Sequence, residues 1–309
     1  MKRRKIALLL AGLMAASMLA GCSSDAGNGN SGSGSSGSGS SGSGDSGNGD
    51  SGSEAITVIT REDGSGTRGA FVELMGLEDE EGNDLTDVNA DIAGSTSVMM
   101  TNVAGNPYAI GYISLGSLDA TVKAIKVDGV AATVDEILAG NYKVSRPFNI
   151  AVKQDSLSEV AQDFVDYILS TEGQAVIEKA GYIPLSDTKA YAGSKPSGEI
   201  RVSGSSSVSP VMEKLIEAYE ALNTNASIQL QETDSTSGMN DAIEGRSDIG
   251  MASRELKQSE TESGLTGIVI ATDGIAVIVN KENPIEDLSS EQIKKIFMGQ
   301  AASWEEFEG

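Results

Sequence analysis

Strands that run into Ser/Gly-rich turns and then into helices recur along this chain, and this repeat most constrains its fold. Four such turns are Arg61–Arg68, Ala93–Ser97, Ser203–Pro210 and Asp234–Gly238. Because strands alternate with helices throughout, the pattern predicts an α/β fold. Ligands of such folds bind beyond the carboxyl ends of the strands, where the strand-to-helix turns converge. We therefore expect the ligand site at these turns.

The first of these turns has the composition of an anion site. Gly64 and Gly66 let the backbone approach a ligand closely, while Ser65 and Thr67 add hydroxyl donors. Arg61 supplies a fixed positive charge, and the helix that follows offers unpaired N–H groups in its first turn. The alternative is an ordinary strand-to-helix turn whose serine caps the helix.

The other three turns repeat this pattern, and they differ in how strongly they indicate an anion site. At Ala93–Ser97 a simple N-cap is the favoured interpretation. Ser203–Pro210 holds more hydroxyl groups than capping a helix requires, and Asp234–Gly238 opens a further helix. Three or four such turns would surround one small anion with neutral donors, and Arg61 would neutralise part of its charge.

The rest of the folded body continues the alternation. Strands are expected near residues 55–60, 108–113, 120–127, 146–152, 198–202, 226–231, 248–253, 268–271 and 275–279. Helices are expected after each Ser/Gly turn and at 134–138, 157–168, 172–179 and 293–297. Residues 187–198 are polar and predict a linker, and Thr272–Gly274 predicts a turn between the last two strands.

Residues 1–22 have the order of a signal peptide: a basic start, an apolar run and then Leu19-Ala20-Gly21-Cys22. The last four residues resemble the lipobox of bacterial lipoproteins, in which Cys22 would be acylated, for example with palmitate. The alternative is a signal peptidase site beside an incidental free cysteine. A lipid on Cys22 would anchor the protein without crossing the membrane. We therefore expect it on the outer face of the cytoplasmic membrane.

Residues 23–53 are almost wholly Gly, Ser, Asn and Asp and predict a disordered linker. A Gly/Ser chain of about 31 residues has an r.m.s. span of roughly 30 Å. Such a stalk would let the folded body sit off a membrane and still reach a partner on it.

Composition excludes several classes of function. The net charge is −23, which argues against nucleic acid, against anionic lipid and against long-range attraction of an anion. Any anion site must therefore work through local donors. Histidine is absent and Cys22 is the only cysteine, so the commonest general base, metal ligand and nucleophilic thiol are missing from the folded body. We expect no cofactor, no metal and no enzyme activity; a phosphatase built on the anion pocket is the enzymatic alternative.

Five segments together carry a resemblance to a known family: Arg61–Arg68, Ser145–Ile150, Val202–Pro210, Asp248–Lys257 and Asp273–Asn280. With them the chain resembles the phosphate-binding lipoproteins of bacterial phosphate ABC transporters, the PstS-type class of periplasmic-binding proteins. The resemblance covers nearly all of residues 54–309. It implies a two-lobed α/β fold of class II type, with a hinge of two crossing strands.

The order of these segments differs from the family's usual order. There the Ser-rich turn of Gly204 lies near the mature N-terminus, and the Arg61–Arg68 turn follows the Trp304 segment. The chain therefore resembles a circular permutation; a fragment of a tandem duplication is the alternative. If the crossings lie near 148–152 and 268–279, one lobe comprises residues 54–150 plus 271–309 and the other residues 151–270.

The resemblance implies site residues, position by position. Family phosphate ligands fall on Arg61, Ser65, Gly66, Thr67, Ser206, Ser207 and Thr236. Asp63 matches an acid that pairs with the arginine and orients it. Ser253 stands in the site where many members have an aspartate that accepts the proton of hydrogen phosphate. Asp273 and Asp63 are the remaining candidates for that role, although Asp273 also fits a plain turn residue at the hinge.

The resemblance implies a lipid-anchored, monomeric receptor that captures inorganic phosphate and passes it to a membrane permease of a phosphate ABC transporter. Two alternatives stay open. One is a receptor for another tetrahedral oxyanion such as sulfate, because Ser253 is no carboxylate. The other is a phosphate-sensing or adhesive surface protein without a role in transport.

Overall fold

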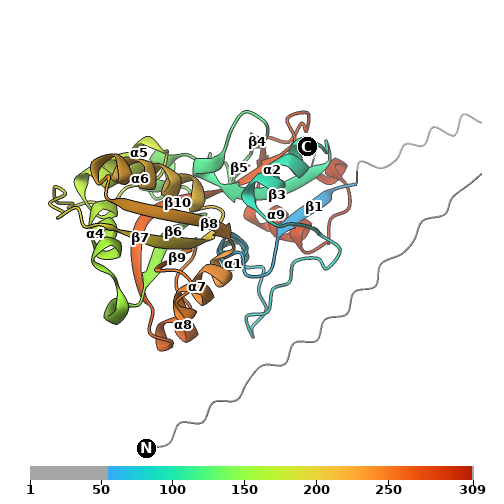
Figure 1. The fold of residues 1–309 in the computed structure, drawn as a ribbon. Helices are drawn as coiled ribbons and strands as arrows, with labels where there is room; N and C mark the ends of the chain where they lie inside the picture. Colours follow the sequence, from blue (N-terminus) through green and yellow to red (C-terminus); the bar gives the residue numbers. More distant parts are fainter. Residues whose placement is uncertain (1–54, 308–309) are drawn as a thin grey trace, which may run out of the picture. The chain divides into compact units, whose positions relative to one another are not determined.

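The computed structural model describes residues 55–307 (Figure 1). The predicted signal peptide, Cys22 and the predicted stalk lie outside the described residues. The strands are β1 (Thr57–Arg61), β2 (Asp91–Ala93), β3 (Ala109–Ser114), β4 (Lys123–Ala124), β5 (Lys126–Val127), β6 (Ser145–Val152), β7 (Gly198–Ser205), β8 (Ala226–Thr233), β9 (Ile249–Ala252), β10 (Thr266–Val279) and β11 (Asp287–Leu288). The helices are α1 (Gly66–Leu74), α2 (Thr96–Ala104), α3 (Val134–Leu138), α4 (Glu159–Ile168), α5 (Thr171–Lys179), α6 (Ser209–Leu222), α7 (Ser235–Glu244), α8 (Gln258–Glu262) and α9 (Ser290–Phe297).

Most of these strands form one mixed sheet in the order β2-β1-β3-β10-β6-β9-β7-β8. β1 is parallel to β2 and β3, and β7 is parallel to β8 and β9. Between these two parallel groups, β10 and β6 run antiparallel to each other and to their outer neighbours. The α/β class predicted from the sequence is confirmed, and two parallel units are joined by two antiparallel strands.

β10 corrects one expectation. The predicted turn at Thr272–Gly274 is instead part of one continuous strand of 14 residues. It remains extended because Asp273 pairs with Arg146 on β6, while Thr272 exchanges backbone hydrogen bonds of 2.9 and 3.0 Å with Ile183. The first part of β10 pairs with β6 and the last part pairs with β3.

The predicted strand at 120–127 is also interrupted. Two short strands, β4 and β5, take its place. The Ile125 N–H donates to Val277 O in β10, whereas the Lys126 N–H donates to Glu286 O beside β11. The segment therefore passes from the large sheet to the two-stranded sheet β11-β5.

Two separate apolar cores flank the crossing of β6 and β10. The first draws its residues from 58–144 and 275–304, with Phe71, Tyr112 and Phe297 in mutual ring contact. The second draws its residues from 148–182 and 200–271. Figure 1 shows the elements that contribute to the first core, among them β1, β3, α2 and α9, and those that contribute to the second, among them α4, α5 and α6. The two-lobed fold of periplasmic-binding proteins is confirmed.

The segment 187–198, expected as a linker, contains no helix or long strand but is firmly attached. Asp163 on α4 accepts hydrogen bonds from the Tyr191 hydroxyl, the Tyr219 hydroxyl and the Ser194 N–H. The Tyr191 ring also packs edge-on against Tyr167. This buried carboxylate therefore ties the segment to the second core.

Candidate functional site

The Arg61 turn forms where β1 meets α1. β1 ends at Arg61, α1 begins at Gly66, and Ser65 caps the helix by accepting a 3.3 Å hydrogen bond from the Arg68 N–H. Gly64 adopts a φ of 88°, a conformation that side chains rarely tolerate. The turn thus combines an N-cap serine with a backbone bend that glycine permits.

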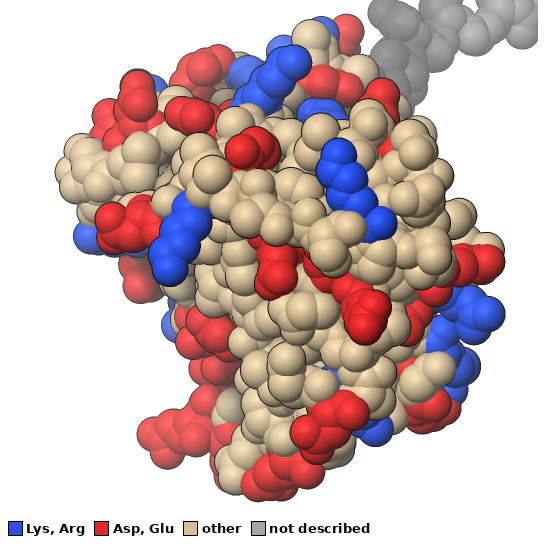
Figure 2. Space-filling view, turned by 60° about the vertical axis from the view of Figure 1, so that its left-hand side comes forward, with Lys and Arg blue, Asp and Glu red and all other residues tan. Residues whose placement is uncertain are grey.

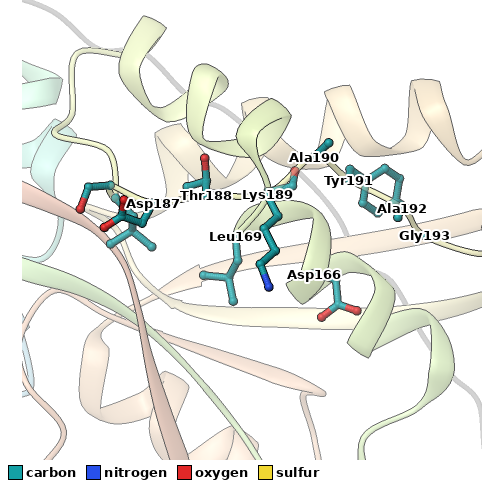
Figure 3. Close-up of a pocket in the computed structure, with 12 residues that line it drawn as sticks. Asp166, Leu169, Asp187, Thr188, Lys189, Ala190, Tyr191, Ala192 and Gly193 are labelled. Atoms are coloured by element: carbon teal, nitrogen blue, oxygen red, sulfur yellow. The ribbon is translucent and has the colours of Figure 1, made fainter.

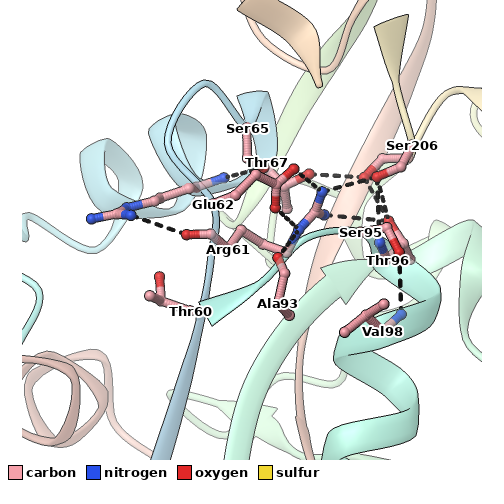
Figure 4. Close-up of polar contacts among 12 residues, drawn as sticks. Thr60, Arg61, Glu62, Ser65, Thr67, Ala93, Ser95, Thr96, Val98 and Ser206 are labelled. Atoms are coloured by element: carbon pink, nitrogen blue, oxygen red, sulfur yellow. Dashed lines mark hydrogen bonds and ion pairs between the residues drawn. The ribbon is translucent and has the colours of Figure 1, made fainter. Parts of the chain in front are cut away.

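The Arg61 guanidinium is buried and lies against the β7–α6 turn (Figure 4). Its Nη2 donates to Ser206 Oγ at 2.9 Å, and its Nη1 donates to Thr96 Oγ1 at 3.4 Å. Glu62 accepts from Nε and Nη2 at 2.8 Å each, and this two-point pairing fixes the plane of the guanidinium. Arg61 therefore presents a positive charge at the boundary between the two cores.

The expectation that Asp63 orients Arg61 is wrong, because Glu62 does so. The Asp63 side chain is 99% exposed and pairs with Arg68 Nη1 at 2.9 Å. Asp63 lies in the turn after β1 and faces solvent, where Arg68 in the first helical turn is the cation within reach. Glu62 is one position closer to the end of the strand and folds back onto the guanidinium.

Ser206 and Ser207 lie in the turn between β7 and α6 and are buried. Neither caps α6, because Val208 holds the N-cap position and no side chain bonds there. Thr96 Oγ1 lies 3.4 Å from Ser206 Oγ and 3.2 Å from Ser207 Oγ. Thr67 Oγ1 lies 2.8 Å from Ser207 Oγ. Hydroxyl groups from both cores therefore converge beside Arg61.

Ser253 adds one more hydroxyl to this set, on the side of the second core. It is fully buried at the end of β9, and Ser205 Oγ donates to its Oγ at 3.0 Å. Thr67 Oγ1 lies 3.4 Å away, and the Ser253 N–H donates to Ser235 Oγ at 3.1 Å. The position that the resemblance associates with an aspartate is thus part of a neutral hydroxyl chain.

Thr236, at the start of α7, contacts the backbone of the Arg61 turn. Both the N–H and the hydroxyl of Thr236 donate to Gly64 O at 3.1 Å. The two residues also line a pocket of about 210 Å³, whose charged lining comprises Asp63, Arg68, Glu78, Asp84, Arg254 and Lys257. Thr236 therefore joins the two turns but does not contact Ser206 or Ser207 directly.

Asp273 lies at the crossing strands rather than among the hydroxyl groups. Its Oδ2 accepts from Arg146 Nη2 at 3.2 Å, and its Oδ1 accepts from the Gly116 N–H at 3.4 Å. Burial raises the pKa of Asp273 to about 6, although Arg146 opposes that shift. The acid that contacts the Arg61 guanidinium is Glu62 and not Asp273.

Four residues of this arrangement were not among the predicted ligands: Glu62, Thr96, Ser205 and Ser235. The sequence did contain a signal for Thr96, because the Ala93–Ser97 turn repeats the Ser/Thr pattern. Ser95 caps α2 there by accepting a 3.3 Å hydrogen bond from the Val98 N–H, as expected, which leaves the Thr96 hydroxyl free to face Ser206. No pattern in the sequence distinguishes Glu62 from Asp63.

The electrostatics around the site are acidic. Burial raises the pKa of Glu232, and the nearby carboxylates of Glu213 and Glu62 raise it further, while Arg61 lowers it. On the face drawn in Figure 2, Asp and Glu side chains are widely spread and Lys and Arg side chains lie singly among them. An anion would therefore be held by the local donors around Arg61 and not by the field of the surface.

Within 55–307, no three His, Cys, Asp or Glu side chains are grouped so that they could hold a metal ion, and no helix is long and apolar enough to cross a membrane. A pocket of about 440 Å³ lies between α4 and residues 185–193 (Figure 3). Its lining mixes Lys189 with carboxylates and apolar groups, and none of the predicted ligands lines it.

Comparison with known sequences places these features in context. A sequence profile described as a PBP superfamily domain matches residues 45–172 and 189–309. Phosphate-binding protein PstS 2 of Streptococcus agalactiae serotype V is 48% identical over 310 residues, covering 98% of each chain. The protein of the same name from Streptococcus pneumoniae serotype 4 is 44% identical over 257 residues, which cover 82% of this chain and 88% of that one. Phosphate-binding protein PstS of Bacillus subtilis is 31% identical over 140 residues, 44% of each chain.

A solved structure of a phosphate-binding protein is also similar to this chain. The crystal structure of a phosphate-binding protein of a phosphate ABC transporter from Streptococcus pneumoniae superposes with a TM-score of 0.66 and 42% sequence identity. The superposition covers 82% of this chain and 100% of the other.

Proposed function

This chain belongs to the PBP superfamily and, within it, to the PstS phosphate-binding proteins, and from that membership we propose that it captures inorganic phosphate for a phosphate ABC transporter. One observation carries the proposal at the level of the site. The buried Arg61 guanidinium donates to Ser206 Oγ across the boundary between the two cores, amid hydroxyl groups from both sides. A guanidinium with several neutral donors suits a tetrahedral oxyanion.

The proposed ligands are the predicted residues Arg61, Ser65, Gly66, Thr67, Ser206, Ser207, Thr236 and Ser253, with Thr96 added from its position. Gly66 and Thr67 begin α1, where backbone N–H groups lack partners in a preceding turn and point to the helix N-terminus. Because ligand contacts would come from both lobes, phosphate would stabilise the closed arrangement of a hinge. We assign the lobes to residues 54–150 plus 271–309 and to residues 151–270.

The acid that accepts the phosphate proton stays a prediction. Asp273 and Asp63 were the candidates; Asp273 faces Arg146, and Asp63 faces Arg68. Selectivity for phosphate over sulfate therefore rests on family membership, and a receptor for another tetrahedral oxyanion is the alternative. We propose a binding protein without catalysis, since the sequence contains no histidine and no cysteine beyond Cys22.

The delivery step requires a place at the membrane. We propose that residues 1–22 are a lipoprotein signal peptide, that a lipid on Cys22 anchors the mature chain outside the cytoplasmic membrane, and that residues 23–53 are its stalk. The body would act as a monomer on the permease. A phosphate-sensing surface protein without transport is the alternative, and an uptake assay in cells that lack their own receptor separates the two.

We also propose that the chain is circularly permuted relative to those family members that align with it over only part of its length, and that PstS 2 of Streptococcus agalactiae shares its segment order. Two features support this. The two ends of the described body lie together, since Ala55 pairs with Ser303 and the Ile56 N–H donates to Ala302 O at 3.0 Å. The alignment with the Streptococcus agalactiae protein runs over 98% of each chain, whereas that with the Bacillus subtilis protein covers 44%.

Titration calorimetry of the purified chain with phosphate and with sulfate tests the proposed ligand. We expect one tight phosphate site and much weaker sulfate binding. Equal affinity for both anions would leave an oxyanion receptor without phosphate selectivity. Turnover of a phosphomonoester by the purified chain would instead favour an enzyme.

A further inference from the structure

A second buried polar cluster lies where β6 and β10 cross, and none of the proposed phosphate ligands belongs to it. This crossing cluster consists of Arg146 on β6, Asp273 on β10, Ser114 at the end of β3, Ser117 in the following 3-10 turn, and Tyr182 after α5. Arg146, Ser114 and Tyr182 are at most 3% exposed. The cluster gathers groups from both cores, since Ser114 follows the first core and Tyr182 belongs to the second.

Direct contacts hold these groups together. Asp273 accepts from Arg146 Nη2 at 3.2 Å and from the Gly116 N–H, which lies between the two serines, at 3.4 Å. The Tyr182 ring packs so closely on Gly116 that an added Cβ would lie 2.3 Å from it. The guanidinium carbon of Arg146 lies 5.5 Å from the Phe148 ring, which in turn packs on the Tyr182 ring at 5.3 Å.

Several polar side-chain atoms of the cluster nevertheless lack a hydrogen-bond partner in the protein. Among residues 55–307, the buried side-chain N and O atoms without a protein hydrogen-bond partner are Arg146 Nε, Arg146 Nη1, Ser114 Oγ, Ser117 Oγ, Tyr182 Oη and, elsewhere, Thr86 Oγ1. All but one thus lie in this single place. Folded proteins rarely leave buried polar groups unpaired. The arginine N–H groups can only donate, so a hydroxyl that donates must find its acceptor elsewhere.

Several donors of the cluster therefore have no acceptor in hydrogen-bond geometry. Arg146 offers N–H groups at Nε and Nη1 that can only donate, each of the three hydroxyls can donate as well as accept, and each carboxylate oxygen of Asp273 already accepts one bond, from Nη2 or from the Gly116 N–H. We propose that the crossing cluster binds one small hydrogen-bond acceptor, a water molecule or a halide ion, between Arg146 and the hydroxyls of Tyr182, Ser114 and Ser117. The Arg146–Asp273 pair is neutral as a unit, which suits a neutral or singly charged occupant better than a doubly charged oxyanion.

The occupant would act as a fixed point of the hinge. It would touch Arg146 on β6, which pairs with Asp273 on β10, and hydroxyls beside both cores, so it would stabilise the observed arrangement of β6 and β10 by holding the Arg146–Asp273 pair in place at a buried position. This role does not depend on which anion binds at Arg61, and its test needs no phosphate.

Crystals of the full chain grown in sodium bromide, without phosphate, test the site and identify its occupant. We expect density within hydrogen-bond distance of Arg146 Nε or Nη1 and of Tyr182 Oη. An anomalous bromine peak assigns a halide, and density without that peak assigns water; both support the site. No density there would overturn the proposal, and so would an oxyanion that also touches Arg61, because the cluster would then belong to the site already described.

Thermal unfolding of Tyr182→Phe gives an independent test. Tyr142→Phe is the matched control, because the buried Tyr142 hydroxyl donates to Ile275 O at 2.7 Å. If an occupant bonds the Tyr182 hydroxyl, each variant should lower Tm by about 2–4 °C, the shift expected for one lost hydrogen bond in a body of this size. A Tyr182→Phe chain as stable as the unaltered one, beside a destabilised Tyr142→Phe chain, would contradict the proposal.

Discussion

Thr67 Oγ1 lies 2.8 Å from Ser207 Oγ, although the two residues are 140 positions apart in the chain. Both side chains are buried, one in the first turn of α1 and the other in the turn before α6. At this point the two cores thus meet through hydroxyl groups. Substitutions at this boundary should therefore change ligand affinity more than they change folding.

Gly66→Ala should block the close approach of the two lobes. An added Cβ at Gly66 would lie 2.4 Å from Ser235 Oγ and 2.8 Å from Ser253 Oγ, both in the proposed second lobe. Overpacking of this kind costs about 1–3 kcal/mol, so phosphate affinity should fall roughly 5- to 150-fold. Gly69→Ala is the control, because no atom lies within 4 Å of an added Cβ there. Titration calorimetry should show a loss of affinity for the first variant alone; equal affinity in both would remove the boundary from the binding site.

Thr67→Val should weaken binding without harming the fold. Valine keeps the shape of the side chain but loses the hydroxyl that contacts Ser207 and Ser253. The loss of about one hydrogen bond should lower phosphate affinity roughly fivefold to tenfold. Thr101→Val on the exposed side of α2, where the hydroxyl bonds only Ser97 O, should leave affinity as it is. The account fails here if the two variants bind phosphate equally well.

The stability of the protein should depend on the protonation of Asp273. Burial raises its pKa from 3.8 to about 6, so the folded protein holds this proton more tightly than the unfolded chain does. The stabilisation is therefore complete below the unfolded pKa and is lost as pH rises through about 6. Asp273→Asn removes the titration. Relative to that variant, the free energy of unfolding of the unaltered chain should fall by at most about 3 kcal/mol between pH 4 and 6.5. Urea unfolding at several pH values measures it, and a difference that does not change with pH would contradict the shift.

Asp163→Ala should destabilise the second core. The Asp163 carboxylate accepts from two tyrosine hydroxyls and one backbone N–H, so its removal leaves buried donors unpaired. We expect a loss of about 2–4 kcal/mol in the free energy of unfolding. Asp166→Ala, at an exposed position of the same helix, should change it by less than about 0.5 kcal/mol. Similar losses in both variants would mean that the segment 187–198 is not held by Asp163.

The fold was predictable wherever local chemistry decides it. The strand, turn and helix around Arg61 and the helices expected at 134–138 and 293–297 follow from short patterns. β10 was not predictable, because Thr272–Gly274 reads locally as a turn. Its extended form depends on pairing with β6, more than 120 residues earlier, and no local pattern encodes that pairing.

The site was predictable in composition but not in contacts. The composition of the first Ser/Gly turn pointed to Arg61 and Thr67, and the family resemblance named Ser206 and Ser207; the structure brings all four together. The predicted partner of Arg61, Asp63, was wrong. The choice between the adjacent carboxylates of Glu62 and Asp63 depends on the direction of each side chain at the end of β1. The guanidinium that Glu62 contacts also donates to Ala93 O and to Thr96 Oγ1, and these long-range contacts are revealed only by the folded structure.

Phosphate titration of Arg61→Met, beside Arg246→Met, tests the central claim most directly. Arg61 is buried between the two lobes, whereas the Arg246 side chain is 54% exposed and pairs with Asp241. Because a buried guanidinium supplies charge and several hydrogen bonds to a bound oxyanion, we expect Arg61→Met to lower affinity by about 100-fold or more. Arg246→Met should bind phosphate as the unaltered chain does. An unchanged phosphate affinity in a folded Arg61→Met chain would contradict the proposal that the anion binds between the Arg61 turn and the Ser206 turn.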